Sequence, residues 1–284
     1  MKRKALVRFV AGAAMAGSAV ALAGAPGMAA PAAARDASIQ ALNELSGSGH
    51  GTVTRSVSAS GVPLLARFSY LFTDSDHHIR QIEAMPLAQQ SAVEIAFADL
   101  NGDDNYNYRV SHEWVDPTGI VQATFHGNCA GECTRTLLTR PAGDFVFVLT
   151  GFRFTYDSED HHLGKIAVSE NNSQLTTAFE DLNGDDAYSY DISYAWVPRS
   201  RLGTVSSVQN TVHATDVSTN AAAAGEKVIR GFSIDNLGTG TAGDNHIRDL
   251  GVVANANSID AIFGDSNPAD SADWGLLVQY ATLL

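Results

Sequence analysis

Asp76-His77-His78-Ile79 is the stretch that decides the fold, because the chain contains it in three versions. It returns as Asp160-His161-His162-Leu163 and, in altered form, as Asp244-Asn245-His246-Ile247. The three aspartates are spaced 84 and 84 residues apart. Self-similarity at a fixed spacing marks a repeated structural unit. We therefore expect three copies of one module.

The likeness between the copies extends to both sides of this stretch. Upstream, the aromatic residues that match are Phe68, Tyr70 and Phe72 with Phe152, Phe154 and Tyr156, and Phe232 in the third copy. Downstream, residues 96–104 are nearly copied at residues 178–186 and survive in altered form at residues 262–270. The stretch from Tyr106 to Trp114 then matches residues 188–196, and residues 272–280 in the third copy. The repeat thus covers most of the chain.

Alternation of apolar and polar residues predicts strands in every copy. Residues 106–114 and 188–196 alternate for nine residues, which is the period of a half-buried strand. Five or six short antiparallel strands per copy predict an all-β fold of three tandem β-sandwich repeats, with a pseudo-threefold arrangement as an open possibility. Tyr106, Tyr108, Tyr188 and Tyr190 are expected in the core, with stacking on sugar rings as the alternative.

Two local signals predict the connections. Asn101-Gly102 and Asn183-Gly184 predict hairpins, because both residue types tolerate positive φ. Residues 38–45 predict a short helix near the mature N-terminus.

The first residues have the pattern of a secretory signal. A basic start is followed by a small, apolar run and by Ala-x-Ala cleavage choices, which predicts a signal peptide over residues 1–34. The repeats then span residues 35–118, 119–202 and 203–284. We expect a secreted or periplasmic protein, without a membrane span once the signal is removed.

The charge of the chain excludes one class of partner. Removal of residues 1–34 leaves 14 lysines and arginines against 31 aspartates and glutamates, a net charge of −17. So acidic a protein repels phosphate backbones, and nucleic-acid binding is not expected.

Cys129 and Cys133 are the only cysteines in the chain. In an exported protein this pair predicts a local disulfide that pins one hairpin. A zinc site would need two more nearby soft ligands, and only His126 is close in sequence.

The repeated Asp-x-His pairs are candidate carbohydrate-binding residues. In an extended segment Asp and His at this spacing point to one face. The pairs are Asp76 with His78, Asp160 with His162, and Asp244 with His246. They form either a polar pocket for sugar hydroxyls or turns in which Asp caps backbone N–H groups. Around a pseudo-threefold axis, three histidines would also suit a metal ion.

Two acidic loops are candidate calcium sites. Alternating oxygen ligands around a glycine resemble the start of a calcium loop. The residues are Asp99, Asn101, Asp103 and Asp104 in the first copy, and Asp181, Asn183, Asp185 and Asp186 in the second. An EF-hand is excluded, because Val110 and Ile192 stand where its twelfth-position acid belongs. The alternative is a hairpin with solvated acids.

The order of these features resembles the H-type lectin domain, a six-stranded β-sandwich. The residues that carry the likeness are Phe68, Asp76, Ile79, Phe97 and Trp114, then Phe152, Asp160, Leu163, Phe179 and Trp196, then Phe232, Asp244, Ile247, Phe263 and Tyr280. The resemblance implies sugar binding, with sites near subunit contacts of a trimer. Three fused copies would then imitate that trimer in one monomeric chain.

The sequence contains no recognisable catalytic motif: Gly-x-Ser-x-Gly, His-Glu-x-x-His and a phosphate-binding glycine loop are all missing. We therefore expect a multivalent carbohydrate-binding protein rather than an enzyme. The alternatives are a calcium-stabilised structural or surface-interaction protein and, less favoured, a secreted hydrolase.

Overall fold

The computed structural model describes residues 40–73, 78–87, 91–99, 105–156, 162–182, 186–213, 217–237, 247–265 and 273–284. Residues 36–284 form one compact unit, and everything below concerns that unit. The predicted signal peptide lies outside the described residues.

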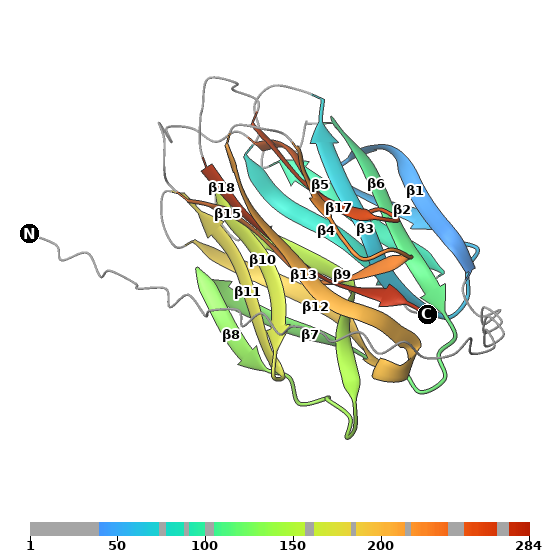
Figure 1. Ribbon diagram of the computed structural model, residues 1–284. Helices are drawn as coiled ribbons and strands as arrows, with labels where there is room; N and C mark the ends of the chain where they lie inside the picture. The colour runs from blue at the N-terminus through green and yellow to red at the C-terminus, as the bar shows by residue number, and fades with distance from the viewer. Residues whose placement is uncertain are drawn as a thin grey trace, which may run out of the picture. The chain divides into compact units, whose positions relative to one another are not determined.

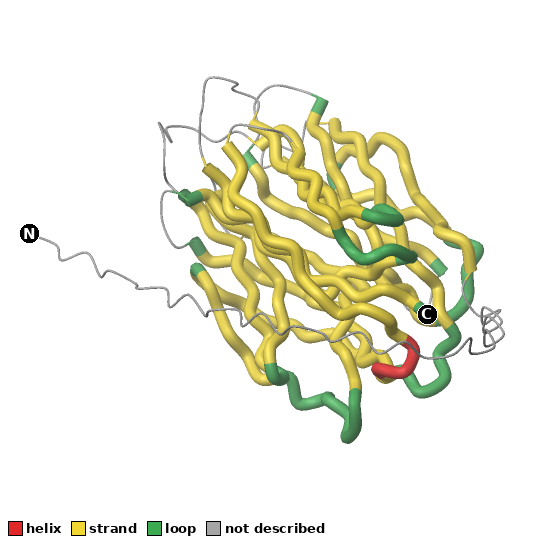
Figure 2. Tube along the Cα trace, in the orientation of Figure 1, coloured by secondary structure: helices red, strands yellow, loops and turns green. Residues whose placement is uncertain are grey.

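The described residues form six strands in each repeat (Figure 1, Figure 2). The first repeat contains β1 (Gln40–His50), β2 (Thr52–Ser56), β3 (Val62–Phe72), β4 (Ile79–Leu87), β5 (Ala92–Asp99) and β6 (Asn105–Val115). The second contains β7 (Val121–Ala130), β8 (Glu132–Thr136), β9 (Phe145–Tyr156), β10 (Leu163–Asn171), β11 (Gln174–Asp181) and β12 (Ala187–Pro198). The third follows a 3-10 turn (Arg199–Arg201) and contains β13 (Leu202–His213), β14 (Val217–Ala221), β15 (Lys227–Asn236), β16 (Ile247–Ala254), β17 (Ser258–Asp265) and β18 (Asp273–Leu283). The all-β prediction is confirmed.

Each repeat is divided between two sheets. Its first, third and sixth strands pair in one sheet, and its second, fourth and fifth strands pair in another. The three sheets have six antiparallel strands each, in the orders β1-β6-β3-β16-β17-β14, β2-β5-β4-β9-β12-β7 and β13-β18-β15-β10-β11-β8. We call them sheets A, B and C. Every sheet is therefore half one repeat and half another.

Pairing between repeats runs through the middle of each sheet. Strand β4 pairs with β9, β10 pairs with β15, and β16 returns to pair with β3 of the first repeat. The third repeat thus closes onto the first, and the repeats form a ring rather than an open row.

Three equivalent phenylalanines lie where the repeats meet. Ring centroids of Phe68, Phe152 and Phe232 are 4.8, 4.9 and 5.4 Å apart, and all three side chains are buried. Their strands β3, β9 and β15 contact one another. An approximate threefold axis passes through this triad, as the repeat allowed.

The aromatic stripes face the core. Tyr106, Tyr108, Tyr188 and Tyr190 are at most 2% exposed, so the core interpretation holds over sugar stacking. Tyr106 also donates to the carbonyl of Ile95, at 3.0 Å, across the two layers of its repeat.

The predicted hairpins at Asn101-Gly102 and Asn183-Gly184 are wrong, although the residues themselves lie outside the described ranges. Strand β5 pairs with β2 and β4, whereas β6 pairs with β1 and β3. The same holds for β11 and β12. These joins therefore carry the chain from one layer to the other, and an Asn-Gly signal cannot distinguish this from a return in one sheet.

Two further expectations are corrected. Residues 40–45 belong to strand β1 rather than to a helix, because their pairing with β6 outweighs local helix propensity. In the third repeat, Trp274 occupies the place of Tyr106, and Thr282 rather than Tyr280 occupies that of Trp114. The alternating pattern has the same phase after a slip of two residues, so it could not reveal the offset.

The disulfide between Cys129 and Cys133 is present, with Cα atoms 6.2 Å apart. It does not pin a hairpin. Strand β7 is at the edge of sheet B and β8 at the edge of sheet C, so the bond ties two sheets at a corner.

Because the sheets are shared between repeats, we expect unfolding in a single cooperative transition. Replacing Phe152 by alanine removes a ring from the axial triad and should cost about 3–5 kcal/mol of unfolding free energy. Denaturant titration followed by fluorescence and by circular dichroism measures both. Leu138→Ala is the control, because this side chain is 91% exposed and should change stability by less than about 0.5 kcal/mol. Two separate transitions would contradict the shared-sheet argument.

Candidate functional site

Two of the predicted histidines lie side by side. The ring centroids of His78 and His162 are 4.9 Å apart with a T-shaped geometry, so the equivalent residues of repeats 1 and 2 meet. The backbone N–H of His78 donates to Asp99 at 3.2 Å, and that of His162 donates to Asp181 at 3.1 Å. The other predicted sugar-binding residues, which are Asp76, Asp160, Asp244 and His246, lie outside the described residues.

The calcium prediction is only partly within the described structure. Asp99, Asp181 and Asp186 are described, and the first two accept the histidine N–H groups. Asn101, Asp103, Asp104, Asn183 and Asp185 lie outside the described ranges. Among the described residues no group of three or more His, Cys, Asp or Glu side chains could hold a metal ion. Calcium binding stays a prediction.

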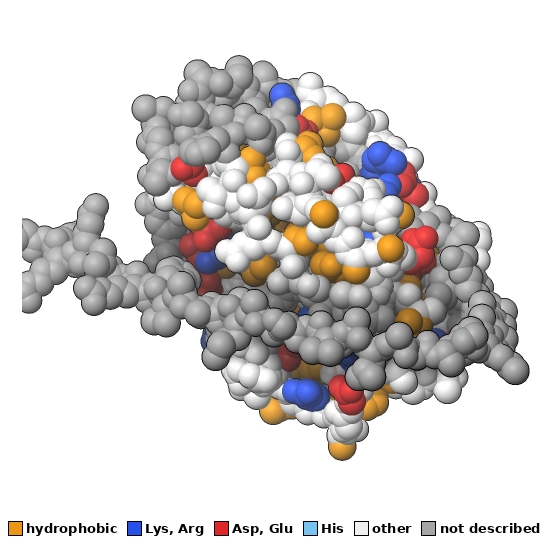
Figure 3. Space-filling model, viewed as in Figure 1, with side chains coloured by type: hydrophobic (Ala, Val, Ile, Leu, Met, Phe, Trp, Pro, Cys, Tyr) orange, Lys and Arg blue, Asp and Glu red, His pale blue; other side chains and the backbone are white. Residues whose placement is uncertain are grey.

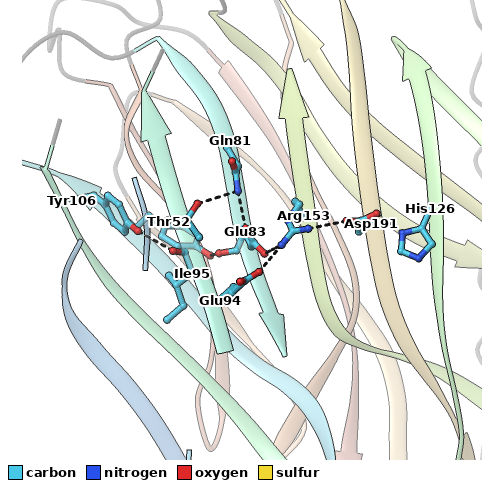
Figure 4. A network of polar contacts seen from close by, with 10 residues as sticks. Thr52, Gln81, Glu83, Glu94, Ile95, Tyr106, His126, Arg153 and Asp191 are labelled. Carbon is cyan, nitrogen blue, oxygen red and sulfur yellow. Dashed lines mark hydrogen bonds and ion pairs between the residues drawn. The ribbon is translucent and has the colours of Figure 1, made fainter. Parts of the chain in front are cut away.

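A charged network that the sequence did not indicate spans five strands of sheet B (Figure 4). Arg153 on β9 forms ion pairs with Glu83 on β4, with Glu94 on β5 at 2.7 Å and with Asp191 on β12 at 3.1 Å. Asp191 also accepts a hydrogen bond from Nδ1 of His126 on β7, at 2.5 Å. The network thus joins repeats 1 and 2 on the outer face of the sheet.

Burial governs the electrostatics of this network. The side chain of Glu83 is fully buried, and burial raises its pKa, although Arg153 opposes that rise. The hydrogen bond with Glu83 raises the pKa of Arg153. In contrast, the side chain of His126 is 71% exposed, so this end of the network is open to a ligand.

Among the described residues, an ion pair at the register position of Arg153 and Glu83 occurs in one of the three sheets. At the register position of Arg153, the first repeat has Ser69 and the third has Ser233. Across the repeat boundary, Ser69 pairs with Gly251 and Ser233 pairs with Ala167, whereas Arg153 pairs with Glu83. On the side of the molecule drawn in Figure 3, uncharged and hydrophobic side chains occupy the middle and charged ones lie toward the margins. Comparison of the three copies at outward-facing positions would have revealed this departure from symmetry.

A cleft of 510 Å³ lies at the junction of repeats 1 and 2, and we call it cleft I. Trp114 and Tyr194 are among its lining residues, although both side chains are buried, and none of the lining residues is charged. The polar groups that line it are the side chains of Ser60, Ser91, Gln122, Thr124, Thr150 and Ser193. Thr124 and Ser193 are joined by a 2.7 Å hydrogen bond.

Cleft I continues into a polar strip on the same face of sheet B. Gln122, Thr124, His126 and Asn128 alternate along β7, so their side chains share one face. Ser189, Asp191 and Ser193 stand opposite on β12. The strip ends in a shallow hollow of 270 Å³ beside His126 and Asn128.

A second cleft, cleft II, of 210 Å³ lies at the junction of repeats 2 and 3. The strand register makes it the counterpart of cleft I, with Trp196 in the place of Trp114. Both indole Nε1 atoms are buried, and within the described part of the chain neither has a hydrogen-bond partner.

A β-bulge shapes both clefts. The pairing of the third and sixth strands shifts by one residue in every repeat, at Ala66, Thr150 and Arg230. Thr150 lines cleft I and Arg230 lines cleft II. Bulges re-aim single side chains, and this one supplies a side chain to each cleft. Below cleft I, Nε2 of buried His112 donates to the carbonyl of Thr150 at 3.0 Å, and burial lowers the pKa of His112 to about 4.

Comparison with known proteins assigns no family: a scan against protein-family models and a search of curated proteins both find no match. Within the described ranges, no helix has the length and hydropathy needed to cross a membrane.

Breaking the sheet B network should destabilise the fold. Arg153→Leu leaves the buried Glu83 carboxylate without its cation, and we expect a loss of about 2–4 kcal/mol in unfolding free energy. The double variant Arg153→Leu with Glu83→Gln should recover part of that loss, because it no longer buries a charge. Equal losses in both variants, measured by denaturant titration, would show that the ion pair is not the cause.

Glu113 offers a test by pH. It lies among the apolar side chains of Leu64, Val115 and their neighbours, at the register position of Ala195 and Ala281. Burial, and then the charge of Glu226, raises the pKa of Glu113 to about 7. The folded state therefore holds this proton more tightly than the unfolded chain does. Stability should fall as pH rises from about 4.5 to about 7, by on the order of 1–3 kcal/mol.

The measurement is the difference between the wild type and Glu113→Gln in unfolding free energy across this pH range. The variant removes one titrating group and leaves the others, so its stability should depend less on pH. Parallel pH profiles would contradict the assignment.

Proposed function

We propose that this chain is an exported carbohydrate-binding protein and that cleft I is its principal sugar site. The observation that carries the proposal is the lining of cleft I, which combines several hydroxyl groups and an amide with no charge. Sugar hydroxyls both donate and accept hydrogen bonds, and neutral hydroxyls and amides match them in both roles.

The size and accessibility of cleft I support the same function. Its volume is within the range of about 300–1,000 Å³ typical of small-molecule sites. Gln122 and Thr124 are exposed at the opening, whereas Thr150 and Ser193 are buried. A sugar would therefore meet rigid groups at the base of the cleft and adaptable groups at its rim.

The polar strip extends the binding surface beyond one sugar unit. From cleft I it passes His126 and Asp191 and reaches the hollow beside Asn128. The likeness to H-type lectins supports this location, because sugar sites of that family lie near subunit contacts and cleft I lies where two repeats meet.

The proposal places the sugar away from the Asp-x-His pairs. His78 stands just before the first residue of β4, while Pro86 and Leu87 at the other end of that strand line cleft I. The competing function, a calcium-stabilised surface-interaction protein, depends on the acidic loops at the His78 end. A chelator therefore separates the two functions.

The test is a glycan array with residues 35–284, run in calcium and again in chelator, followed by titration of the best neutral glycan. Since no acidic side chain lines cleft I, binding should be the same in both conditions. Gln122→Ala and Ser193→Ala should each weaken binding about 3- to 10-fold, as expected for one lost hydrogen bond. His78→Ala is the matched control and should keep full affinity.

Absence of glycan binding in both conditions would reject the proposal. Binding that chelator abolishes, or that His78→Ala abolishes in a folded protein, would move the site to the acidic end. A melting temperature raised by calcium, without glycan binding, would favour the structural alternative.

A further inference from the structure

Clefts I and II occupy equivalent places but present opposite chemistry. The strand registers superpose Thr150 on Arg230, Pro86 on Glu170 and Gln122 on Val205. Cleft I is uncharged. Cleft II has two arginines and one glutamate in its lining, in a chain whose net charge is −13. The positive charge is therefore local to cleft II.

The guanidinium of Arg230 is only partly engaged. It has five N–H donors. Its Nε donates to the carbonyl of Phe147 at 3.1 Å, and its Nη2 lies 3.9 Å from the carboxylate of Glu170. A closed charge-assisted hydrogen bond is about 2.7–2.9 Å long, so this pair is not closed. Glu170 instead accepts the backbone N–H of Ser173 at 2.6 Å.

The second arginine is held over the indole ring of the same cleft. The guanidinium carbon of Arg140 lies 5.6 Å from the ring centroid of Trp196. Arg140 is exposed, whereas Arg230 is largely buried, with 17% of its side chain accessible. Cleft II thus has one largely buried cation and one exposed cation, and the exposed one lies over an aromatic ring.

We propose that cleft II binds an acidic sugar, with the carboxylate of a uronic acid received by Arg230 and Arg140. The inference deepens the proposed carbohydrate-binding function and rests on it. A planar guanidinium pairs with a carboxylate through two parallel hydrogen bonds, which a partly engaged Arg230 can still form. At 210 Å³ cleft II is smaller than cleft I, which suits one sugar unit. The chain then carries a neutral and an acidic sugar site in adjacent junctions.

The test is calorimetric titration of residues 35–284 with an oligogalacturonate and with the uncharged galactose oligosaccharide of the same length. Arg230→Gln should weaken oligogalacturonate binding about tenfold or more, because it removes the positively charged guanidinium that pairs with the carboxylate. Arg230→Lys should recover only part of this loss, since an ammonium cannot form two parallel hydrogen bonds with a carboxylate. Arg140→Gln, at an exposed position, tests the same site without disturbing the base of the cleft. Arg109→Gln is the control, because this arginine is 59% exposed and lines neither cleft, and it should leave oligogalacturonate affinity unchanged.

The outcomes separate the two proposals. Binding of the neutral glycan without oligogalacturonate binding would overturn the acidic-site inference and leave the function in cleft I intact. Oligogalacturonate binding that none of the Arg230 and Arg140 variants weakens, with melting temperatures unchanged, would also overturn it. Equal binding of a sulfated galactose oligosaccharide would replace the carboxylate assignment by a general anion site. Failure of both glycans would reject the sugar-binding function itself.

Discussion

Pairing of strands between successive repeats is the constraint on which the rest of the structure depends. Strands β4 and β9, β10 and β15, and β16 and β3 form the central seam of each sheet. An unpaired strand edge inside a sheet would leave its backbone N–H and C=O groups without partners. A single repeat has such an edge on each of its two layers, and only a neighbouring repeat satisfies it. The last pairing, β16 with β3, closes the ring.

The same constraint explains where the candidate sites lie. The seams keep the interior alike in all repeats, as the Phe68, Phe152 and Phe232 triad shows. Outside the seams, residues that face solvent are free to differ, and the network around Arg153 exists in one sheet only. In the described part of the chain, two of the three junctions leave a cleft beside the seam, so one architecture produces clefts with different linings.

Much of the fold followed from the sequence, and the sites did not. Period-two alternation identified the strands around Tyr106 and Tyr188, because burial of one face imposes it. Alternation says nothing about which layer a strand joins, so the Asn101-Gly102 join was assigned to the wrong connection. Alternation also cannot reveal a slip of two residues, so the sequence matched Tyr280, rather than Thr282, with Trp114 in the third copy. Residues such as Arg153 and Gln122 face outward, where no periodic pattern constrains them, and two partners of Arg153, Glu83 and Glu94, come from another repeat.

The recurring β-bulge shows how such a fold can diversify its sites without losing stability. An extra residue in the third strand of each repeat is excluded from the regular ladder, and in the second and third repeats this residue lines a cleft. The residue is Ala66, Thr150 or Arg230, which differ in size, polarity and charge. Because the backbone pairing around the bulge is the same in all three repeats, the sheet does not dictate the identity of this residue. A methyl group, a hydroxyl and a guanidinium thus stand at one structural position, and the last two give clefts I and II different chemistry on the same backbone.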